Sequence, residues 1–269
     1  MLESELGRPL FVRHGHGVTL TEAGQLLLER SQSILRQVEQ TANEIKRGDS
    51  GPSGTITIAL PPTAGFLLAP ALVVALRREF PNVFLRFVGG FSGYIHEWLI
   101  RGQVDLACLH DPIPQRGFEV QPILREQVFV VRKPNPSSPI DGPIPIAELL
   151  AMPLVVPSGM NATRRLLDSL AAQQGVWFQP SAEVDDHTIM RALIRNGQAV
   201  SLLTRGAFAD DLARGQVEAF PTSPPIYWTL KLVTCLRSAR SPLAEVFAQK
   251  LVEVANRLRA EGAWEAEPV

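Results

Sequence analysis

The stretch "GTITIALPPTAGFLLAPALVVALRREFPNVFLRFVG" (residues 54–89) decides the fold of this chain. Residues 55–60 and 82–90 are short apolar runs, which predict two strands. The longer apolar run at 65–80 between them predicts a helix. A strand, a helix and a strand in this order are typical of an α/β fold.

The same alternation of strands and helices continues to the end of the chain. After a predicted strand at 127–132, a proline-rich run at 133–145 interrupts the pattern, which restarts at residue 153. A long strand at 227–237 and an amphipathic helix at 242–262 complete it. We therefore expect two mostly parallel, helix-covered sheets, which form two lobes with a cleft between them.

The composition is that of an ordinary globular protein. Of the 269 residues, 45% are hydrophobic and 20% are charged, and the net charge is −1. DNA or anionic lipid would therefore have to be bound by a local patch. Cys108 and Cys235 lie in apolar runs, which favours buried thiols over a disulfide or a metal site. The sequence contains no apolar run long enough to span a membrane and no signal peptide, so we expect a cytoplasmic protein.

The N-terminal stretch "LFVRHGHGVTLTEAGQLLLERSQSIL" (10–35) predicts a short basic hairpin that leads into a long helix. Thr21 is a suitable N-cap, and no proline interrupts residues 22–47. A narrow apolar stripe at coiled-coil-like spacing follows this helix, at Leu27, Ile34, Val38, Thr41 and Ile45. Because a lone helix with such a stripe is unstable in water, we expect it to pair with a second copy. The alternative is that the stripe packs on the chain's own downstream domain, beyond a linker at 48–54.

Polar side chains follow several of the predicted strands. In open α/β sheets, ligands bind beyond the carboxyl ends of strands, where helix N-termini offer N–H groups and partial positive charge. The ligand-binding candidates at these positions are Thr63, Ser92, His110, Asp111, Ser158, Asn161, Thr163 and Thr204, with Asp186 and His187 at matching strand ends. Apart from the histidines, each residue taken singly is better explained as an ordinary N-cap, worth about 1 kcal/mol to its helix, and the prediction of a ligand site depends on the set. His110 could pair with an anionic ligand or be a structural histidine.

No motif of an enzyme stands out in the sequence. It lacks a G-x-S-x-G elbow, an H-E-x-x-H motif, a P-loop and a G-x-G-x-x-G motif after a strand. Ser158, His187 and Asp186 could be combined on paper into a nucleophilic triad, but nothing marks Ser158 as activated. We therefore expect no catalytic residues, no cofactor and no metal.

The N-terminal residues also carry a specific resemblance. They contain the skeleton Leu2-Glu3, Leu6-Gly7, Leu10-Phe11, Arg13, Leu20-Thr21 and Ala23-Gly24. With "GTITIALPPT", "FPNVFLRFVGGFSG" and "LIRGQVDLACLHDP", this skeleton is similar to the LysR-type family of bacterial transcriptional regulators, from Leu2 to about Arg259. "GFSGYIHEWL" further resembles the branch of nitrogen-assimilation-control regulators.

The resemblance implies a winged helix-turn-helix joined by a dimerising helix to a two-lobed effector domain of the type II periplasmic-binding-protein fold. It assigns 1–20 to the end of the recognition helix and the wing, 21–47 to the dimerisation helix, 55–132 with 233–262 to lobe I, and 133–232 to lobe II. It also implies that Thr63, Ser92, His110 and the loop from Ser158 to Thr163 hold a small anionic effector. The expected partners are this effector, promoter DNA and one or three further copies of the chain.

The chain departs from the family pattern before the wing. Roughly forty residues of that pattern, including the helix that reads base edges, would precede Met1. The wing residues Arg13, His14 and His16 would contact only phosphates, which adds affinity without sequence readout. Residues 1–47 hold six basic and six acidic side chains, so we expect poor operator binding from the chain as written.

This departure leaves several explanations open. Either the start codon is assigned too late, or the chain is an effector-binding dimer that does not bind DNA. A solute-binding protein, or an enzyme built on the same two-lobed scaffold, are the alternatives from other functional classes.

Overall fold

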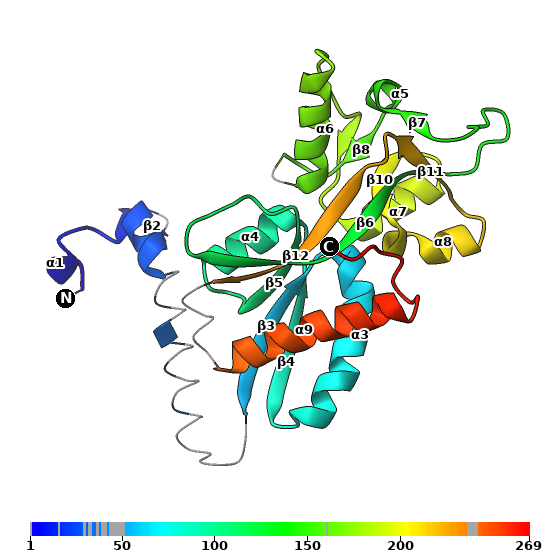
Figure 1. The fold of residues 1–269 in the computed structure, drawn as a ribbon. Helices are drawn as coiled ribbons and strands as arrows, with labels where there is room; N and C mark the ends of the chain where they lie inside the picture. Colours follow the sequence, from blue (N-terminus) through cyan, green and yellow to red (C-terminus); the bar gives the residue numbers. More distant parts are fainter. Residues whose placement is uncertain are drawn as a thin grey trace.

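The computed structural model describes residues 2–15, 17–28, 31, 34–35, 38, 42, 52–159, 161–235 and 242–269. In Figure 1 the main body has two parts, with the N-terminal elements to one side and the C-terminus near the middle. Among the described residues, no helix is long and apolar enough to cross a membrane.

The N-terminal region forms the predicted hairpin. Helix α1 (Leu2–Leu6) precedes strands β1 (Phe11–His14) and β2 (Gly17–Leu20), which pair antiparallel. The Thr21 hydroxyl accepts a hydrogen bond from the Gly24 N–H at 3.0 Å, which confirms Thr21 as the N-cap of the helical residues 22–28. A side chain at Gly24 would place its Cβ 2.0 Å from the carbonyl oxygen of Leu10. Only glycine therefore allows the helix to pack this closely against the backbone of Leu10. His16, Thr41 and Ile45 lie outside the described residues.

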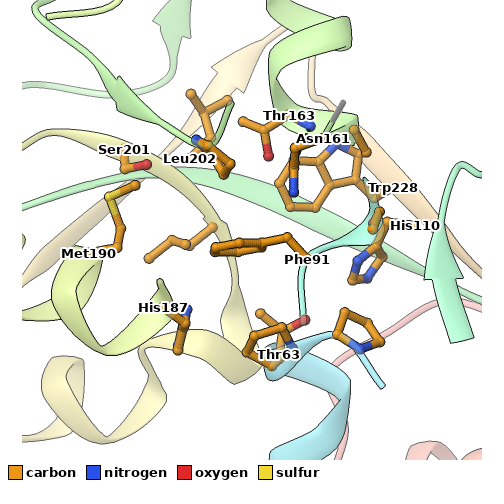
Figure 2. Close-up of a pocket in the computed structure, with 16 residues that line it drawn as sticks. Thr63, Phe91, His110, Asn161, Thr163, His187, Met190, Ser201, Leu202 and Trp228 are labelled. Atoms are coloured by element: carbon orange, nitrogen blue, oxygen red, sulfur yellow. Dashed lines mark hydrogen bonds between the residues drawn. The ribbon is translucent and has the colours of Figure 1, made fainter. Parts of the chain in front are cut away.

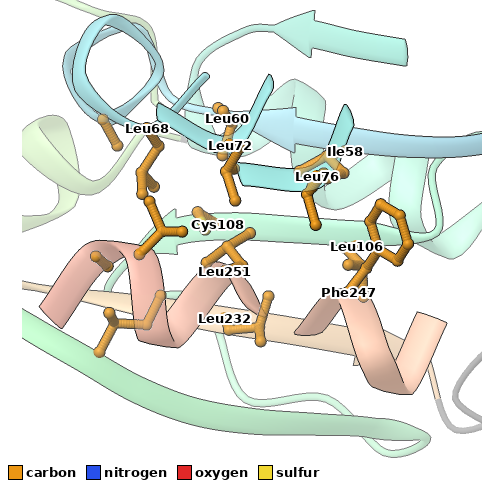
Figure 3. Packing of buried hydrophobic residues seen from close by; sticks show 14 of the residues in the cluster. Ile58, Leu60, Leu68, Leu72, Leu76, Leu106, Cys108, Leu232, Phe247 and Leu251 are labelled. Atoms are coloured by element: carbon orange, nitrogen blue, oxygen red, sulfur yellow. The ribbon is translucent and has the colours of Figure 1, made fainter. Parts of the chain in front are cut away.

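Lobe I is a sheet with helices on both faces. Strands β3 (Gly54–Leu60), β4 (Val83–Gly89) and β5 (Leu106–His110) are parallel, with β3 in the middle. Helices α3 (Pro62–Glu79) and α9 (Pro242–Ala260) cover one face, and α4 (Ser92–Ile100) covers the other. Figure 3 shows Leu68, Leu72 and Leu76 of α3 on the side facing Phe247 and Leu251 of α9, and all five belong to one buried cluster. This packing fixes the first turn of α3 at the carboxyl end of β3.

Lobe II has the same layered plan. It contains strands β7 (Ile144–Pro145), β8 (Val155–Val156), β9 (Ala182–Glu183), β10 (Ser201–Thr204) and β11 (Glu218–Ser223). Its helices are α5 (Ile146–Ala151), α6 (Ala162–Gln173), α7 (His187–Arg195), the 3-10 turn η1 (Arg205–Ala207) and α8 (Ala209–Ala213). Two buried clusters, one with α5 and α6 and one with α7 and α8, hold these elements together.

Two long strands join the lobes, and they correct the expectation of mostly parallel sheets. Strand β6 (Phe118–Arg132) pairs antiparallel with β12 (Tyr227–Cys235), and β12 pairs antiparallel with β5. Strands β10 and β11 also pair antiparallel with β6. The eight-stranded sheet is therefore mixed, because both lobes share strands that return in the opposite direction.

Sequence patterns missed the starts of two long elements and the whole segment at 144–151. Strand β6 begins at Phe118, nine residues before the predicted strand at 127–132. Helix α3 begins at Pro62, where a proline fits the first turn because its missing N–H would be unpaired in any case. The short strand β7 and helix α5, at 144–151, were not predicted.

The C-terminal segment (residues 261–269) lies across the junction of the lobes. Arg125 of β6 and Glu267 exchange two backbone hydrogen bonds, of 2.9 and 2.8 Å. The Trp264 side chain is buried and donates its indole N–H to Glu126 Oε1 at 3.0 Å. The Arg205 guanidinium of η1 lies 3.5 Å from the Glu265 carboxylate. The segment therefore contacts the shared strand β6 and also lobe II.

Candidate ligand-binding site

A pocket lies between the two lobes where strands end and helices begin. Strands β3, β4 and β5 of lobe I lead to one side of it, and α6, α7 and β10 of lobe II form the other (Figure 2). We call this cavity the inner pocket, and its free volume is about 40 Å³. Its lining residues are Pro61, Pro62, Thr63, Phe91, Ser92, His110, Pro157, Asn161, Ala162, Thr163, His187, Met190, Ser201, Leu202, Leu203 and Trp228.

Five of the eight ligand-binding candidates line this inner pocket. They are Thr63, Ser92, His110, Asn161 and Thr163. Ser158 instead lines a second, outer cavity, which Phe91 and Asn161 also border. Asp111 and Thr204 line neither cavity: the Asp111 side chain accepts a hydrogen bond from the Thr229 N–H at 3.3 Å, and Thr204 is fully buried.

Thr63 has a hydroxyl without a hydrogen-bond partner. The residue is 8% exposed, and its Oγ1 contacts no donor or acceptor among the described residues. It does not cap α3, because the helix begins at Pro62 and Pro61 occupies the N-cap. A buried hydroxyl without a partner costs free energy, and a ligand in the pocket would supply the missing hydrogen bond.

His187 presents a second unpartnered polar atom to the same pocket. Burial, and next the positive charge of Arg191, lowers the pKa of His187 from 6.5 to about 4, although a hydrogen bond to the backbone of Ala207 opposes this. The imidazole is therefore neutral at pH 7. Its Nε2 has no hydrogen-bond partner among the described residues. With the other ring nitrogen held at Ala207, Nε2 is a free acceptor for a donor on a ligand.

His110 belongs to a buried chain of polar groups. Its Nε2 lies 2.8 Å from Glu126 Oε2, and the other oxygen of Glu126 accepts the hydrogen bond from Trp264. Glu126 is only 1% exposed. His110 therefore already has an acidic partner inside the protein, which reduces its attraction for an anionic ligand.

The helices around the pocket begin with their N-termini toward it. The Asn161 side chain caps α6 by accepting the Thr163 N–H at 2.8 Å, and Asp186 caps α7 by accepting the Ile189 N–H at 2.8 Å. Asn161 thus serves as a cap and lines the pocket at once. The partial positive charge of these helix ends favours a ligand with electron-rich atoms. No lysine, arginine, aspartate or glutamate among the described residues lines the inner pocket.

Sequence patterns missed the apolar side chains of the pocket. Phe91, Met190, Leu202 and Trp228 surround the centre of Figure 2, and none of them was a candidate. Their residue types indicate core packing. Only the position of Phe91, directly before a predicted helix start, could have indicated a place in the pocket. His187 was noted at a strand end but was not among the candidates.

Ser158, His187 and Asp186, which the sequence allowed as a nucleophilic triad, do not form one site. Asp186 is occupied as the cap of α7, and Ser158 borders the outer cavity whereas His187 borders the inner one. Cys108 is buried and unpaired, and burial raises the pKa of its thiol. Among the described residues, no group of three or more metal-ligating side chains is close enough to hold a metal ion.

Comparison with known proteins identifies the family. The model of the LysR substrate binding domain matches residues 49–256, which is most of the chain. The chain belongs to the LysR-type family of transcriptional regulators. Members of this family are regulators rather than enzymes, and they bind effectors and DNA.

Curated relatives of this LysR-type regulator cover nearly its whole length. It is 29% identical to the HTH-type transcriptional regulator BbuR of Bordetella bronchiseptica over 269 residues, which are 99% of the chain and 82% of BbuR. It is also 29% identical to the nitrogen assimilation regulatory protein Nac of Escherichia coli, over 94% of the chain and 83% of Nac. The branch indicated by "GFSGYIHEWL" is thus among its relatives.

Solved structures show that the fold of this LysR-type regulator is shared. A point variant of full-length OxyR from Pseudomonas aeruginosa matches 93% of the chain and 82% of its own length, with a TM-score of 0.66 and 22% identity. Full-length CbnR in complex with its target DNA matches 94% of the chain and 86% of its own length, with a TM-score of 0.65 and 19% identity. The two-lobed effector domain expected from the sequence is confirmed.

Proposed function

We propose that this LysR-type regulator senses a small effector in the inner pocket between its lobes and changes the geometry of a DNA-bound oligomer in response. One observation carries the proposal: Thr63 of lobe I and His187 of lobe II each bring a buried, unpartnered polar atom to the same pocket. A ligand that bonds both would hold the lobes together, and differential binding to one arrangement shifts the population toward it. Ser92, His110, Asn161 and Thr163 complete the proposed contacts, with Ser158 at the outer cavity.

The charge of the effector is the finer part of this proposal. An anionic effector was expected from His110, which is paired with Glu126, and the other histidine in the pocket is neutral at pH 7. The helix N-termini supply only partial charges. We therefore infer an uncharged or singly negative effector with a hydroxyl, carboxyl or amide group at Thr63 and His187. An ion with two or more negative charges would lack compensation.

The DNA-binding part of the proposal rests on the wing. Arg13 and His14 are exposed on β1 and available to phosphates. Ile34 and Val38 of the proposed dimerisation helix are 58% and 59% exposed in the single chain, as an unpaired seam would be. The competing hypothesis, an effector-binding dimer that does not bind DNA, predicts no salt-dependent binding to the promoter region in a mobility-shift assay.

A thermal-shift screen tests the effector site. Small metabolites bearing no charge or one to three negative charges are added to the purified full chain, since a ligand of the folded state raises the melting temperature. We expect hits among uncharged and singly negative compounds, and we expect Thr63→Val to reduce the shift because it removes the hydroxyl and keeps the shape.

The matched control is Thr188→Val, which changes an exposed threonine on α7 outside the pocket and should leave every shift as in the wild type. Hits that Thr63→Val leaves unchanged would contradict the site. A preference for compounds with two or three negative charges would contradict the proposed effector charge.

A further inference from the structure

Phe91 stands between the inner pocket and the outer cavity. The outer cavity, about 110 Å³, is lined by Phe91, Gly93, Tyr94, Glu97, Ser158, Asn161 and Asp185. Only Phe91 and Asn161 also line the inner pocket. In Figure 2 the Phe91 ring extends into the middle of the inner pocket, with Met190 and Leu202 toward lobe II and Thr63 and His110 toward lobe I.

The backbone around Phe91 fixes this orientation. The Gly90 N–H donates to the Leu60 carbonyl at 3.3 Å, and the Phe91 carbonyl accepts the Ile95 N–H at 3.1 Å at the start of α4. A Cβ at Gly90 would lie 2.8 Å from the Trp98 ring, so the glycine lets Trp98 pack directly on the main chain. Phe91 therefore leaves an anchored turn with its ring directed toward lobe II.

The size of the inner pocket shows what the ring does there. A space of about 40 Å³ holds a few water molecules, whereas an engineered apolar cavity that binds benzene measures about 150 Å³. Without the Phe91 ring, the inner pocket would gain the ring's own volume and open into the outer cavity. The space would then hold an aromatic ring among Met190, Leu202 and Trp228.

We propose that the Phe91 ring occupies the place of the effector's apolar body in the closed pocket and so determines which effectors fit. This inference rests on the proposed function of the pocket. The effector is then a molecule about the size of one aromatic ring, with its polar group at Thr63 and His187, and it binds when the Phe91 ring swings toward the outer cavity. Phe91 is half-buried, so its ring can move without opening the core of lobe I.

The test uses benzyl alcohol, which combines one aromatic ring with a hydroxyl, and isothermal titration calorimetry on the full chain. We expect Phe91→Ala to bind it at least about ten-fold more tightly than the wild type, because the alanine leaves the ring's space free. Phe91→Leu is a milder change that disturbs folding less than Phe91→Ala. It should give a smaller gain in affinity for benzyl alcohol. Adding Thr63→Val to Phe91→Ala should reduce the gain, because the hydroxyl of the probe loses its partner.

The control is Phe84→Ala, which removes an equal ring from β4 where it is 67% exposed and borders neither cavity. It should leave the affinity unchanged. Equal affinities for the wild type, Phe91→Ala and Phe91→Leu would overturn the inference, as would an equal gain in Phe84→Ala. The outcome is separate from the metabolite screen on the wild type, which tests whether the pocket senses an effector at all.

Discussion

The protonation of His187 gives the pocket a measurable pH dependence. Its pKa in the folded protein is about 4, against 6.5 for an ordinary histidine, because burial disfavours the charged ring. As the pH falls from 6.5 to 4, His187 becomes protonated in the unfolded chain while it stays neutral in the folded chain. His187 therefore makes its full contribution to the free energy of unfolding above pH 6.5. This contribution decreases as the pH falls toward 4.

Replacing His187 by glutamine removes this contribution. We expect the free energy of unfolding of His187→Gln to fall less steeply than that of the wild type between pH 6.5 and 4, by up to about 1.4 kcal/mol per pH unit. Urea unfolding at several pH values measures the difference. Thr188→Val serves as the control, since it changes the next, exposed residue of α7 without removing a titrating group, and it should keep the wild-type slope. Parallel slopes for the wild type and His187→Gln would contradict the assigned pKa.

Most polar side chains of the pocket were predictable residue by residue, whereas His187, Ser201 and the apolar side chains were not. Thr63, Ser92 and Asn161 were predicted because parallel strands bring their carboxyl ends to one edge, wherever the chain places a polar residue there. Phe91 and Trp228 have side chains that are common in any core. Their place in the pocket depends on how the two lobes face each other, which no local pattern encodes.

Strand β6 shows the same limit for an element. In its first half, "FEVQPILRE" (118–126), the alternation of apolar and polar residues lasts only four residues and stops at Pro122. The register between β6 and β12 shifts between Leu230 and Lys231, opposite Leu124 and Pro122. This bulge accommodates a proline, which cannot donate a backbone hydrogen bond. Long-range pairing thus overrides the local signal.

The proposed dimerisation helix (21–47) leads to a prediction about a single element. A glutamate in place of Val38 would put a charge in the apolar seam, where pairing would have to bury it without a partner. We expect Val38→Glu to shift the full chain from dimer to monomer in sedimentation velocity runs. Gln25→Glu adds the same charge at an exposed position off the seam and should remain dimeric. If Val38→Glu sediments as a dimer, the seam does not hold the copies together.

At the scale of the whole molecule, the two lobes are joined by strands rather than by a loose linker. Val128 and Val130 of β6 pack in a lobe II cluster, although residues up to 132 were assigned to lobe I. We therefore propose that the boundary lies within β6, before Val128. The two-lobed fold was predictable from the repeated alternation of elements. The return of the chain to lobe I within the strand at 227–237 was also expected. The antiparallel pairing of this strand with β5 and β6 was not, because pairs between distant segments leave no mark in either segment alone.

The C-terminal segment ties the junction together and can be tested by one substitution. Trp264→Phe keeps most of the buried ring but removes the N–H that Glu126 accepts. Since a buried carboxylate oxygen then loses its partner, we expect the free energy of unfolding to fall by about 1–3 kcal/mol in urea titrations. Trp177→Phe, at a residue 89% exposed, should change it by less than about 0.5 kcal/mol. Equal stabilities of the two variants would show that the bond contributes nothing.

The position of the C-terminal residues determines where dyes should be attached to measure movement of the lobes. Val269 follows a segment that is paired to β6 at Arg125, close to the boundary between the lobes that we propose within β6. A dye attached there would travel little however far the lobes swing. A donor and acceptor pair at Phe84 and Trp177, which are 67% and 89% exposed and lie in different lobes, would report the swing as a change in energy transfer.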